Sequence, residues 1–327
     1  QHIYTIPEQP YAVPYVTSYY QKNWGFCLED SVKQNLKPGM YKAHIEAQHF
    51  KGSLTYGELL IKGKSDKEVL ISTYCCHPSM ANNELSGPCL AVALAGYLNS
   101  QTDLKFTYRF VFAPETIGAA AVLEKNRTHF KDKVFAAFNL TCVGDDRAWS
   151  FMPSRYGNTY ADKIALHTLK YNTENFDHYS WNDRGSDERM YCSPHIDLPM
   201  VSVMRSKYGT YPEYHTSMDK IGQVVTSKGL QASLNIHKKM IEIIENDCLP
   251  VSQVFGEPQL GRRGLHPMIG TDKKDKVIRN RLNLLSYSDG SLSLLDIAEK
   301  CEVPFEALIP ELDLLVEHRV LRVECLK

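Results

Sequence analysis

The segment at residues 71–87 (ISTYCCHPSMANNELSG) restricts the possible folds more than any other part of the sequence. Its apolar start is typical of a buried strand, its polar middle of a loop, and its small apolar end of a helix start. The loop holds His77, Asn83 and Glu84 within eight residues. Because sites in open α/β sheets form at the carboxyl ends of strands, this segment predicts a sheet edge that carries chemistry.

Strand and helix patterns alternate along the rest of the central region. Apolar runs typical of strands cover residues 69–74, 106–113, 134–143 and 200–204. Helical patterns cover residues 88–98, 119–126, 159–171 and 228–245. Strands that alternate with helices favour a mostly parallel sheet, so we predict the α/β class.

Changes in composition along the chain predict three folded parts and a linker. They are a small β-rich unit at 1–66 with strands at 42–48 and 53–62, an α/β domain at 67–250, a linker rich in proline and glycine at 251–276, and a domain of helices and one strand at 277–327. The chain begins with Gln1 in loop-like sequence, so we expect it to be a fragment of a longer protein.

The composition argues against several functional classes. A formal net charge of −1 gives no overall field to attract nucleic acid or an anionic membrane. There is no run of about 18 apolar residues, so no membrane-spanning helix is expected. The nine cysteines are odd in number and form no CxxC pair, which favours reduced thiols in a cytoplasmic protein. Cys75 and Cys76 would point to opposite faces of a strand, so zinc ligation by this pair is not expected.

Two histidine-bearing loops and a carboxylate are the main candidates for catalysis. His215 lies in a polar loop at 211–220 (YPEYHTSMDK), and we expect it to converge with His77 on one crevice of the sheet. Glu115 follows the apolar strand at 106–113, where it could act as a general base toward a metal-bound water. Such parts are the minimum for a zinc hydrolase site. A structural His77 and a solvated Glu115 are the alternatives.

Further charged residues follow other predicted strands. Asp145 and Asp146 come after the strand at 134–143 and would bind a metal, orient a histidine or cap a loop. A charged loop at 180–193 (SWNDRGSDERMYCS) lies between elements, where it could cover a site or be merely solvated. Its candidates for contact with substrate termini are Arg184, Asp187, Glu188 and Arg189.

In this order, the motifs resemble those of the zinc aminopeptidase superfamily. The series is His77, NELSG from Asn83, ETIG from Glu115, FNLT ending at Thr141, and His215. The chain is more closely similar to bacterial aminopeptidase-like proteins found with polysaccharide-biosynthesis genes. The shared segments are PYVTSYYQKNWGFCL, GSLTYGELLIKG, CHPSMANNELSGP, RGSDERMYCSP, YPEYHTSMD and EPQLGRRGLHP. The resemblance implies a mostly parallel sheet with helices on both faces, a small inserted β domain, a C-terminal winged helix, and first peptidase strands that are missing here.

Three positions depart from the superfamily pattern. Asn83 stands where the bridging aspartate belongs, Thr116 replaces the second glutamate, and Thr141 replaces the aspartate of the third ligand strand. A pair of zinc ions is therefore not expected. The resemblance implies one zinc ion held by His77, Glu84 and His215, although Asn83 occupies the matching position, and it implies Glu115 as the catalytic base. The candidate substrate-binding residues are Asn83, Asp145, Arg184 and Asp187.

The resemblance implies a zinc-dependent hydrolase that cleaves an amide or peptide bond of a small substrate in polysaccharide or secondary-metabolite biosynthesis. Loss of ligands leaves a second hypothesis, a binding or scaffold protein that kept the fold. A DNA-binding role is not favoured, because residues 288–327 hold nine acidic and four basic side chains, a formal charge of −5. The basic run KKDK at 273–276 is too short to reverse this balance. We expect the C-terminal domain to mediate protein contacts instead, for example in a homo-oligomer.

Overall fold

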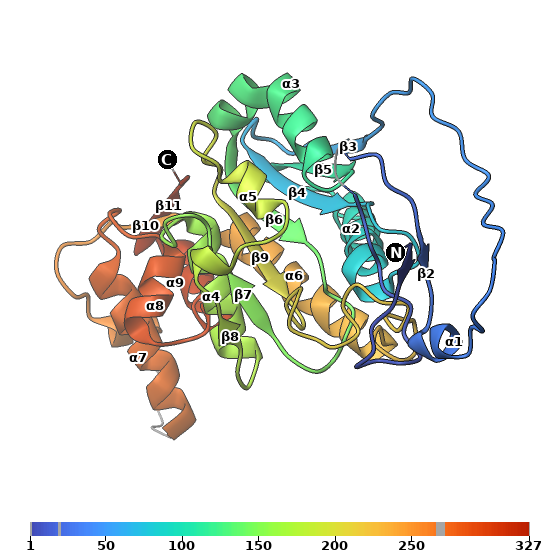
Figure 1. The fold of residues 1–327 in the computed structure, drawn as a ribbon. Helices are drawn as coiled ribbons and strands as arrows, with labels where there is room; N and C mark the ends of the chain where they lie inside the picture. Colours follow the sequence, from blue (N-terminus) through green and yellow to red (C-terminus); the bar gives the residue numbers. More distant parts are fainter. Residues whose placement is uncertain (1, 19–20, 266–271, 327) are drawn as a thin grey trace. The chain divides into compact units, whose positions relative to one another are not determined.

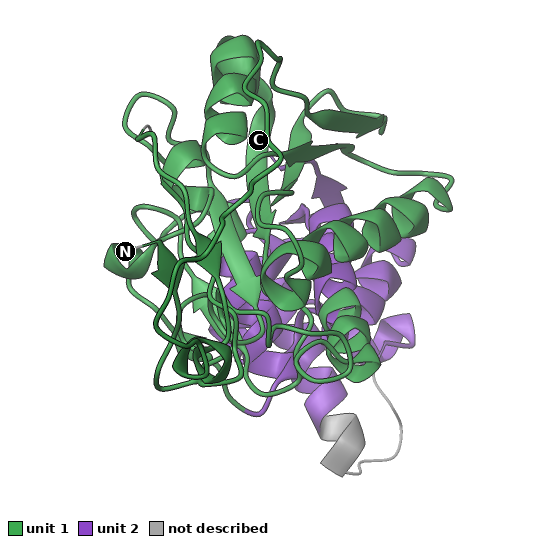
Figure 2. Ribbon diagram, turned by 45° about the vertical axis from the view of Figure 1, so that its right-hand side comes forward, with its two compact units in different colours: residues 1–162, 175–235 green, residues 163–174, 236–327 purple. Residues whose placement is uncertain are grey.

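The computed structural model describes residues 2–18, 21–265 and 272–326, with 272–275 described by their backbone alone. The chain forms two compact units (Figure 2). The first comprises residues 1–162 and 175–235, and the second comprises residues 163–174 and 236–327. Within the described residues, no helix is both long enough and apolar enough to cross a membrane.

A mixed sheet forms the centre of the first unit, with the strand order β3-β5-β4-β6-β9-β7-β8 (Figure 1). The strands are β3 (Gly57–Ile61), β4 (Glu68–Tyr74), β5 (Thr107–Ala113), β6 (Val134–Leu140), β7 (Ser150–Met152), β8 (Asp177–His178) and β9 (Met200–Met204). Strands β5, β4, β6 and β9 run parallel, whereas β3 and β7 pair antiparallel with their inner neighbours. The predicted mostly parallel α/β sheet is confirmed.

Different helices cover the two faces of the central strand β4, because successive side chains of a strand point to opposite sides. Leu70 lies in the same apolar cluster as the buried residues of α3 (Ile117–Lys133). Ser72, on the same face, contacts the hydroxyl of Tyr191 in α5 (Glu188–Tyr191) at 2.9 Å. Thr73 points the other way, toward α2 (Ser86–Asn99). The whole of β4 is buried, as a parallel strand covered on both faces should be.

A tight connection between β4 and α2 brings polar residues to the sheet edge. Ala81–Leu85 form one π-helical turn, η1, directly before α2, and such turns are frequent at functional sites. A Cβ atom at Gly87 would lie 2.3 Å from the Leu140 carbonyl oxygen and 2.5 Å from Thr73 Oγ1. Glycine is therefore required at this position for α2 to approach β4 and β6, which fixes the loop in front of it.

The N-terminal segment runs beside the loop that carries His215. It contains the paired strands β1 (Ile3–Tyr4) and β2 (Phe26–Cys27) and the short helix α1 (Asp30–Gln34). The Tyr15 amide donates to the His215 carbonyl, and the Ser217 amide donates to the Val13 carbonyl, each at 2.9 Å.

The predicted strand at 42–48 was wrong, because these residues are exposed and form no regular element in the structure. Their apolar face would be only alanine and isoleucine, which bury too little surface to offset the cost of ordering. The strand predicted at 53–62 exists but is shorter, and as β3 it extends the central sheet. The strands β7 and β8 and the helix α5 were not predicted. The proposed domain boundaries stay predictions.

The second unit contains helices and one antiparallel pair of strands. Its elements are α7 (Asp272–Tyr287), α8 (Leu294–Cys301), η4 (Phe305–Ala307) and α9 (Ile309–Glu317), with β10 (Leu249–Ser252) antiparallel to β11 (Leu321–Glu324) and the 3-10 turn η3 (Leu260–Arg263). The helices α4 (Tyr160–Asn172) and α6 (Ser227–Asn246) each contribute residues to both units. A buried ion pair of 2.6 Å joins Arg281 of α7 to Glu311 of α9. This helix-and-strand arrangement is the predicted winged-helix type.

Candidate active site

His77 lies just beyond the carboxyl end of β4 and is 7% exposed. Its Nδ1 atom is 2.6 Å from Glu84 Oε1, a charge contact in which the N–H direction does not meet hydrogen-bond geometry. Burial lowers the pKa of His77, but the polar contacts with Cys76 and Glu84 and the charge of Glu84 outweigh it and raise the pKa to about 10. Glu84 is therefore an electrostatic partner of His77.

Glu84 is itself almost fully engaged by neighbouring donors. Its Oε2 accepts from the Cys76 amide at 2.6 Å, and its Oε1 accepts from Asn83 Nδ2 at 2.9 Å in addition to the contact with His77. The side chain is 2% exposed. Both oxygens are thus held by the chain, and this arrangement suits a residue that orients a histidine.

His215 converges with His77, as the sequence predicted. Their ring centroids are 4.6 Å apart, and the ring of Tyr15 lies 4.3 Å from His77 and 5.6 Å from His215. The Nε2 atom of His215 is buried without a hydrogen-bond partner among the described residues. Burial and the charge on His77 lower the pKa of His215 to about 4, so its ring is neutral at pH 7. A neutral, unpartnered ring nitrogen has the form that a metal ligand needs.

Glu115 lies two residues beyond β5, beside the same histidines. Burial raises its pKa, the charge on His77 lowers it, and the charge on Glu84 raises it again. The next residue, Thr116, has a φ of 63°, a conformation that is strained for a branched side chain. Its amide donates to Asp187 Oδ1 at 2.7 Å, and its hydroxyl accepts from Arg189 at 3.1 Å. The charged loop thus holds the backbone next to Glu115 in place.

Asp187 is fully buried, and its Oδ2 has no hydrogen-bond partner in the described part of the chain. Burial raises its pKa to about 8, helped by the nearby Glu115 and Glu188 and opposed by the Thr116 amide. A carboxyl group in this environment carries a proton at neutral pH and is able to donate it in a hydrogen bond.

Asn83 and Thr141, two of the positions that depart from the superfamily pattern, face each other through Tyr74. The Tyr74 hydroxyl donates to Asn83 Oδ1 at 3.2 Å and contacts Thr141 Oγ1 at 2.5 Å. The amides of Asn82 and Asn83 donate to Asp219 at 2.7 and 3.0 Å. All five side chains are buried. In this part of the site, Asn83 and Thr141 are neutral, and their polar groups bond within the chain.

The remaining predicted site residues lie in different surroundings. Asp145 is fully buried and accepts from the Asn82 side chain, from the Arg147 amide and from both the amide and the hydroxyl of Ser206. Such saturation supports a structural role for Asp145 over substrate contact. Arg184 is exposed and lies over the Trp181 ring at 5.1 Å. The substrate roles of both residues stay predictions.

Two residues of the site were not predicted from the sequence. Tyr15 packs on both histidines but is 62 residues from His77 along the chain, and only its aromatic-rich surroundings set it apart. Cys76 Sγ, a His77 ring nitrogen and a Glu115 oxygen all lie within 4.8 Å of one another. Cys76 was considered only together with Cys75, although its position next to His77 was a usable signal.

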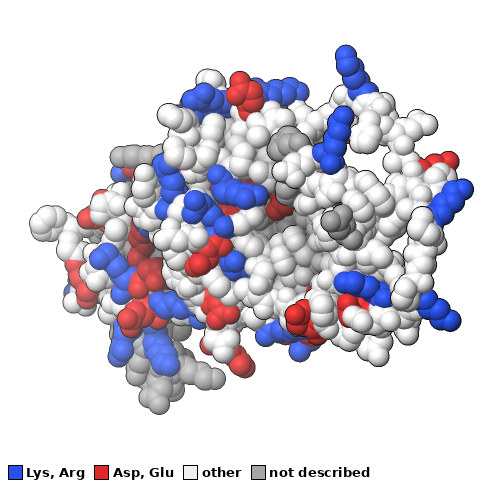
Figure 3. All heavy atoms as spheres, viewed as in Figure 1, with Lys and Arg blue, Asp and Glu red and all other residues white. Residues whose placement is uncertain are grey.

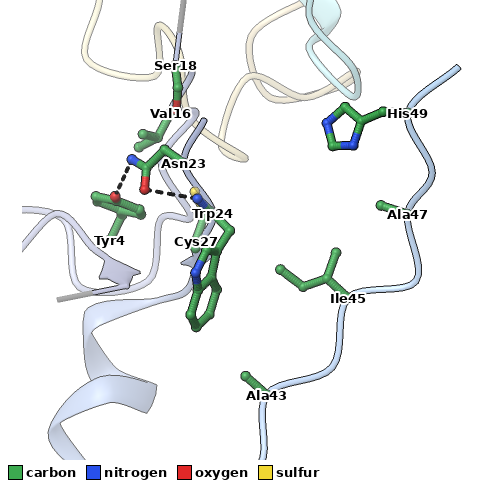
Figure 4. Close-up of a pocket in the computed structure, with 11 residues that line it drawn as sticks. Tyr4, Val16, Ser18, Asn23, Trp24, Cys27, Ala43, Ile45, Ala47 and His49 are labelled. Atoms are coloured by element: carbon green, nitrogen blue, oxygen red, sulfur yellow. Dashed lines mark hydrogen bonds between the residues drawn. The ribbon is translucent and has the colours of Figure 1, made fainter. Parts of the chain in front are cut away.

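A hollow of about 580 Å³ lies elsewhere in the first unit (Figure 4). Trp24 and Ile45 face it from two segments, and the Asn23 side chain at its edge donates to Tyr4 at 3.2 Å. It contains none of the clustered histidines and carboxylates. We therefore place the candidate site at His77 and His215, where the titratable groups converge, and not in this hollow.

On the face drawn in Figure 3, acidic and basic side chains are interspersed, in keeping with the net charge of −1.

Comparison with known proteins agrees with this fold. Residues 4–247 match the model of a domain of unknown function, DUF4910, and residues 249–323 match a winged helix-turn-helix model. A protein from Clostridium acetobutylicum, provisionally named a polysaccharide biosynthesis protein with an aminopeptidase-like domain, is 38% identical over all of this chain and 74% of its own length. A crystal structure from the same organism, provisionally described as a peptidase, has a TM-score of 0.91 at 35% identity over 99% of this chain and 73% of that one. A zinc aminopeptidase from Bacillus subtilis is 15% identical, with a TM-score of 0.49 over 57% of this chain and 49% of that one.

The fold is therefore that of an aminopeptidase-like α/β protein with a C-terminal winged helix. Within that class, the chain belongs to the DUF4910 family. The resemblance inferred from the sequence motifs is confirmed.

Proposed function

We propose that this chain is a metal-dependent hydrolase that cleaves an amide or peptide bond of a small substrate. The observation that carries the proposal is the pair of adjacent rings of buried His77 and half-buried His215, of which His215 has a buried Nε2 atom without a hydrogen-bond partner among the described residues. Burying a polar nitrogen without a partner costs about 1–3 kcal/mol, and ligation of a divalent ion would remove that cost. Glu115 lies within 4.8 Å of His77, in position to act beside the ion.

The donor set fits one ion better than two. Asn83 and Thr141 are neutral and already bonded to Tyr74, so they offer no anionic ligand for a second ion. The two imidazoles suit zinc, whereas magnesium and calcium prefer sites made of oxygen ligands alone. We propose that His77 and His215 are ligands and that Glu84 orients His77 through its contact with Nδ1.

The chain's own residues would perform the proton transfers of hydrolysis. A bound divalent ion would supply Lewis acidity, which polarises the substrate carbonyl and acidifies water. Glu115 would take a proton from the attacking water and pass it to the leaving amine. Asp187, protonated at neutral pH, would hold Thr116 and thereby fix Glu115, with its second oxygen free to donate to substrate.

The name of the Clostridium acetobutylicum relative supports a proposal for the substrate class. Its name links an aminopeptidase-like domain to polysaccharide biosynthesis. We propose an amide in a modified sugar, a small metabolite or a short peptide, handled in the cytoplasm.

Elemental analysis of pure protein, followed by a substrate screen, tests the proposal. We expect about one zinc per chain and metal-dependent release of amine from a set of aminoacyl amides or N-acyl sugars. Two equivalents of metal, or none after gentle purification, would contradict the site assignment.

A second candidate is a binding protein that kept the fold without catalysis. The neutral residues at positions 83, 116 and 141 favour it, since each stands where the superfamily has a carboxylate. Protein that binds an aminoacyl amide or N-acyl sugar in calorimetry but takes up no zinc and releases no amine would establish this alternative.

A further inference from the structure

We propose that Cys76 supplies a thiolate ligand to the metal ion, so that the site contains sulfur as well as imidazole. This inference rests on the proposed function and deepens it. It concerns a ligand that the aminopeptidase pattern does not include at this position.

The geometry around Cys76 is that of a converging donor set. Its Sγ atom, a His77 nitrogen and a Glu115 oxygen lie within 4.8 Å of one another, a spacing that an ion at their centre would close. The ring of His215, with its unpartnered Nε2, lies 4.6 Å from that of His77. One anionic ligand added to the two imidazoles would give the ion three protein ligands and leave its fourth position open for a water or substrate.

Glu115 is assigned to proton transfer, and the two polar residues of the neighbouring turn, Glu84 and Asn83, are already engaged by the chain. Glu84 accepts from the Cys76 amide and the Asn83 side chain and contacts His77. Asn83 is neutral and is bonded to Tyr74 and Glu84. Among the described residues, the exposed Cys76 side chain forms no disulfide, and its hydrogen-bond contact is with the His77 ring, the group with which it would share the ion.

Ligation by Cys76 is chemically balanced without a co-reactant. The sulfur–metal bond forms as the thiol loses its proton to solvent, and no electrons are transferred. A thiolate selects zinc or cobalt over magnesium or calcium and replaces the negative charge that Asn83 does not provide.

The neighbouring cysteine offers a matched control. Cys75 is also exposed, and its amide donates to the Ala113 carbonyl at 3.0 Å, which continues the strand pairing of β4 with β5. Successive side chains of such a backbone point to opposite sides, so only one of the two thiols faces the histidines. The cluster within 4.8 Å contains Cys76 and not Cys75.

Cobalt substitution of the full chain tests the inference without an activity assay. Metal-free protein loaded with Co²⁺ should show a sulfur-to-cobalt charge-transfer band in the near ultraviolet. The band should persist in Cys75→Ser and disappear in Cys76→Ser and Cys76→Asp. Zinc affinity should fall about tenfold or more in Cys76→Ser and recover in Cys76→Asp, which restores an anionic ligand.

Thiol labelling of the wild-type chain provides a second measurement that needs no variant. Bound zinc should protect Cys76, but not Cys75, from iodoacetamide, as mapped by mass spectrometry. A chain that binds cobalt without the band, a band that survives in Cys76→Ser, or labelling of Cys76 that bound zinc does not slow, overturns the thiolate ligand and leaves the proposed function standing. A chain that binds no divalent metal overturns both.

Discussion

Buried histidines occur in both units of this protein, but their partners differ. In the second unit, His167 uses both ring nitrogens: Nε2 accepts from the Phe305 amide at 2.9 Å, and Nδ1 contacts Glu299. In the first unit, His215 has an unpartnered Nε2, and His77 has only a poorly aligned contact with a carboxylate. Burial alone therefore does not mark a functional histidine. What distinguishes the candidate site is that His77 lies beside the His215 ring and within 4.8 Å of donor atoms of Cys76 and Glu115.

The largest expected effect is loss of metal when either histidine of the candidate site is replaced. His77→Ala or His215→Ala should reduce bound zinc from about one per chain to near zero, because two ligands cannot hold the ion tightly. Inductively coupled plasma analysis after dialysis measures this. His167→Gln serves as the control and should keep the metal. If His167→Gln lost zinc and the other two variants kept it, the metal site would lie with the histidine of the second unit.

Next in size is the effect of replacing the base beside the histidines. Glu115→Gln keeps the shape of the side chain and should keep the metal, but it should lower turnover by about 10²-fold, the usual scale for a general base. Steady-state kinetics on a substrate from the screen measures the change. The exposed Asp146→Asn is the control. Unchanged turnover in Glu115→Gln would contradict the assignment, and lowered turnover in Asp146→Asn at the same time would move the role of base to Asp146.

The partnered histidine of the second unit should affect stability instead. Burial lowers the pKa of His167, against the raising effect of Glu299. Because the folded pKa lies below the unfolded value of about 6.5, its contribution to stability is full above that pH and is lost as pH falls through the folded pKa. His167→Gln should cost about 1 kcal/mol at neutral pH through the lost hydrogen bonds and should weaken the acid destabilisation.

Thermal unfolding at neutral and at mildly acidic pH measures this effect. The exposed His318→Gln in the same unit is the control and should follow the wild type at both pH values. An acid response in His167→Gln equal to that of the wild type would show that His167 is not the group that titrates.

The smallest expected effect concerns DNA binding. We predict that the protein does not bind DNA, despite its winged-helix fold. Helix α9 contains no lysine or arginine, and residues 288–327 carry a formal charge of −5, so phosphate contacts are lacking. The basic run at 273–276 adds little, and the side chains of 273–275 lie outside the described residues. Electrophoretic shift with random duplex DNA at low salt measures binding. Salt-sensitive binding would contradict the prediction if the double variant Arg319→Glu/Arg322→Glu removed it. Lys131→Glu in the first unit is the control and should not change such binding.

The sequence determined the elements that depend on local pattern. Strand β9 has the predicted bounds, and β4, β5, α2 and α6 agree to within one or two residues, because buried parallel strands and helices have strong periodicities. The convergence of His77 and His215 was also predictable, since the carboxyl ends of parallel strands share one edge. The prediction of a strand at 42–48 was wrong because the alternation of apolar and polar residues there offers only a small apolar face, which is not enough to bury the segment.

Only the tertiary structure decided which polar groups are satisfied. The sequence gives no sign that Tyr74 bonds both Asn83 and Thr141, or that Glu84 accepts two hydrogen bonds and also contacts His77. Nor does it show that Cys76, and not Cys75, joins His77 and Glu115. These facts depend on side-chain direction and on contacts between segments far apart in the chain. Such contacts arise from packing in three dimensions, whereas periodicity records only which face of an element is buried.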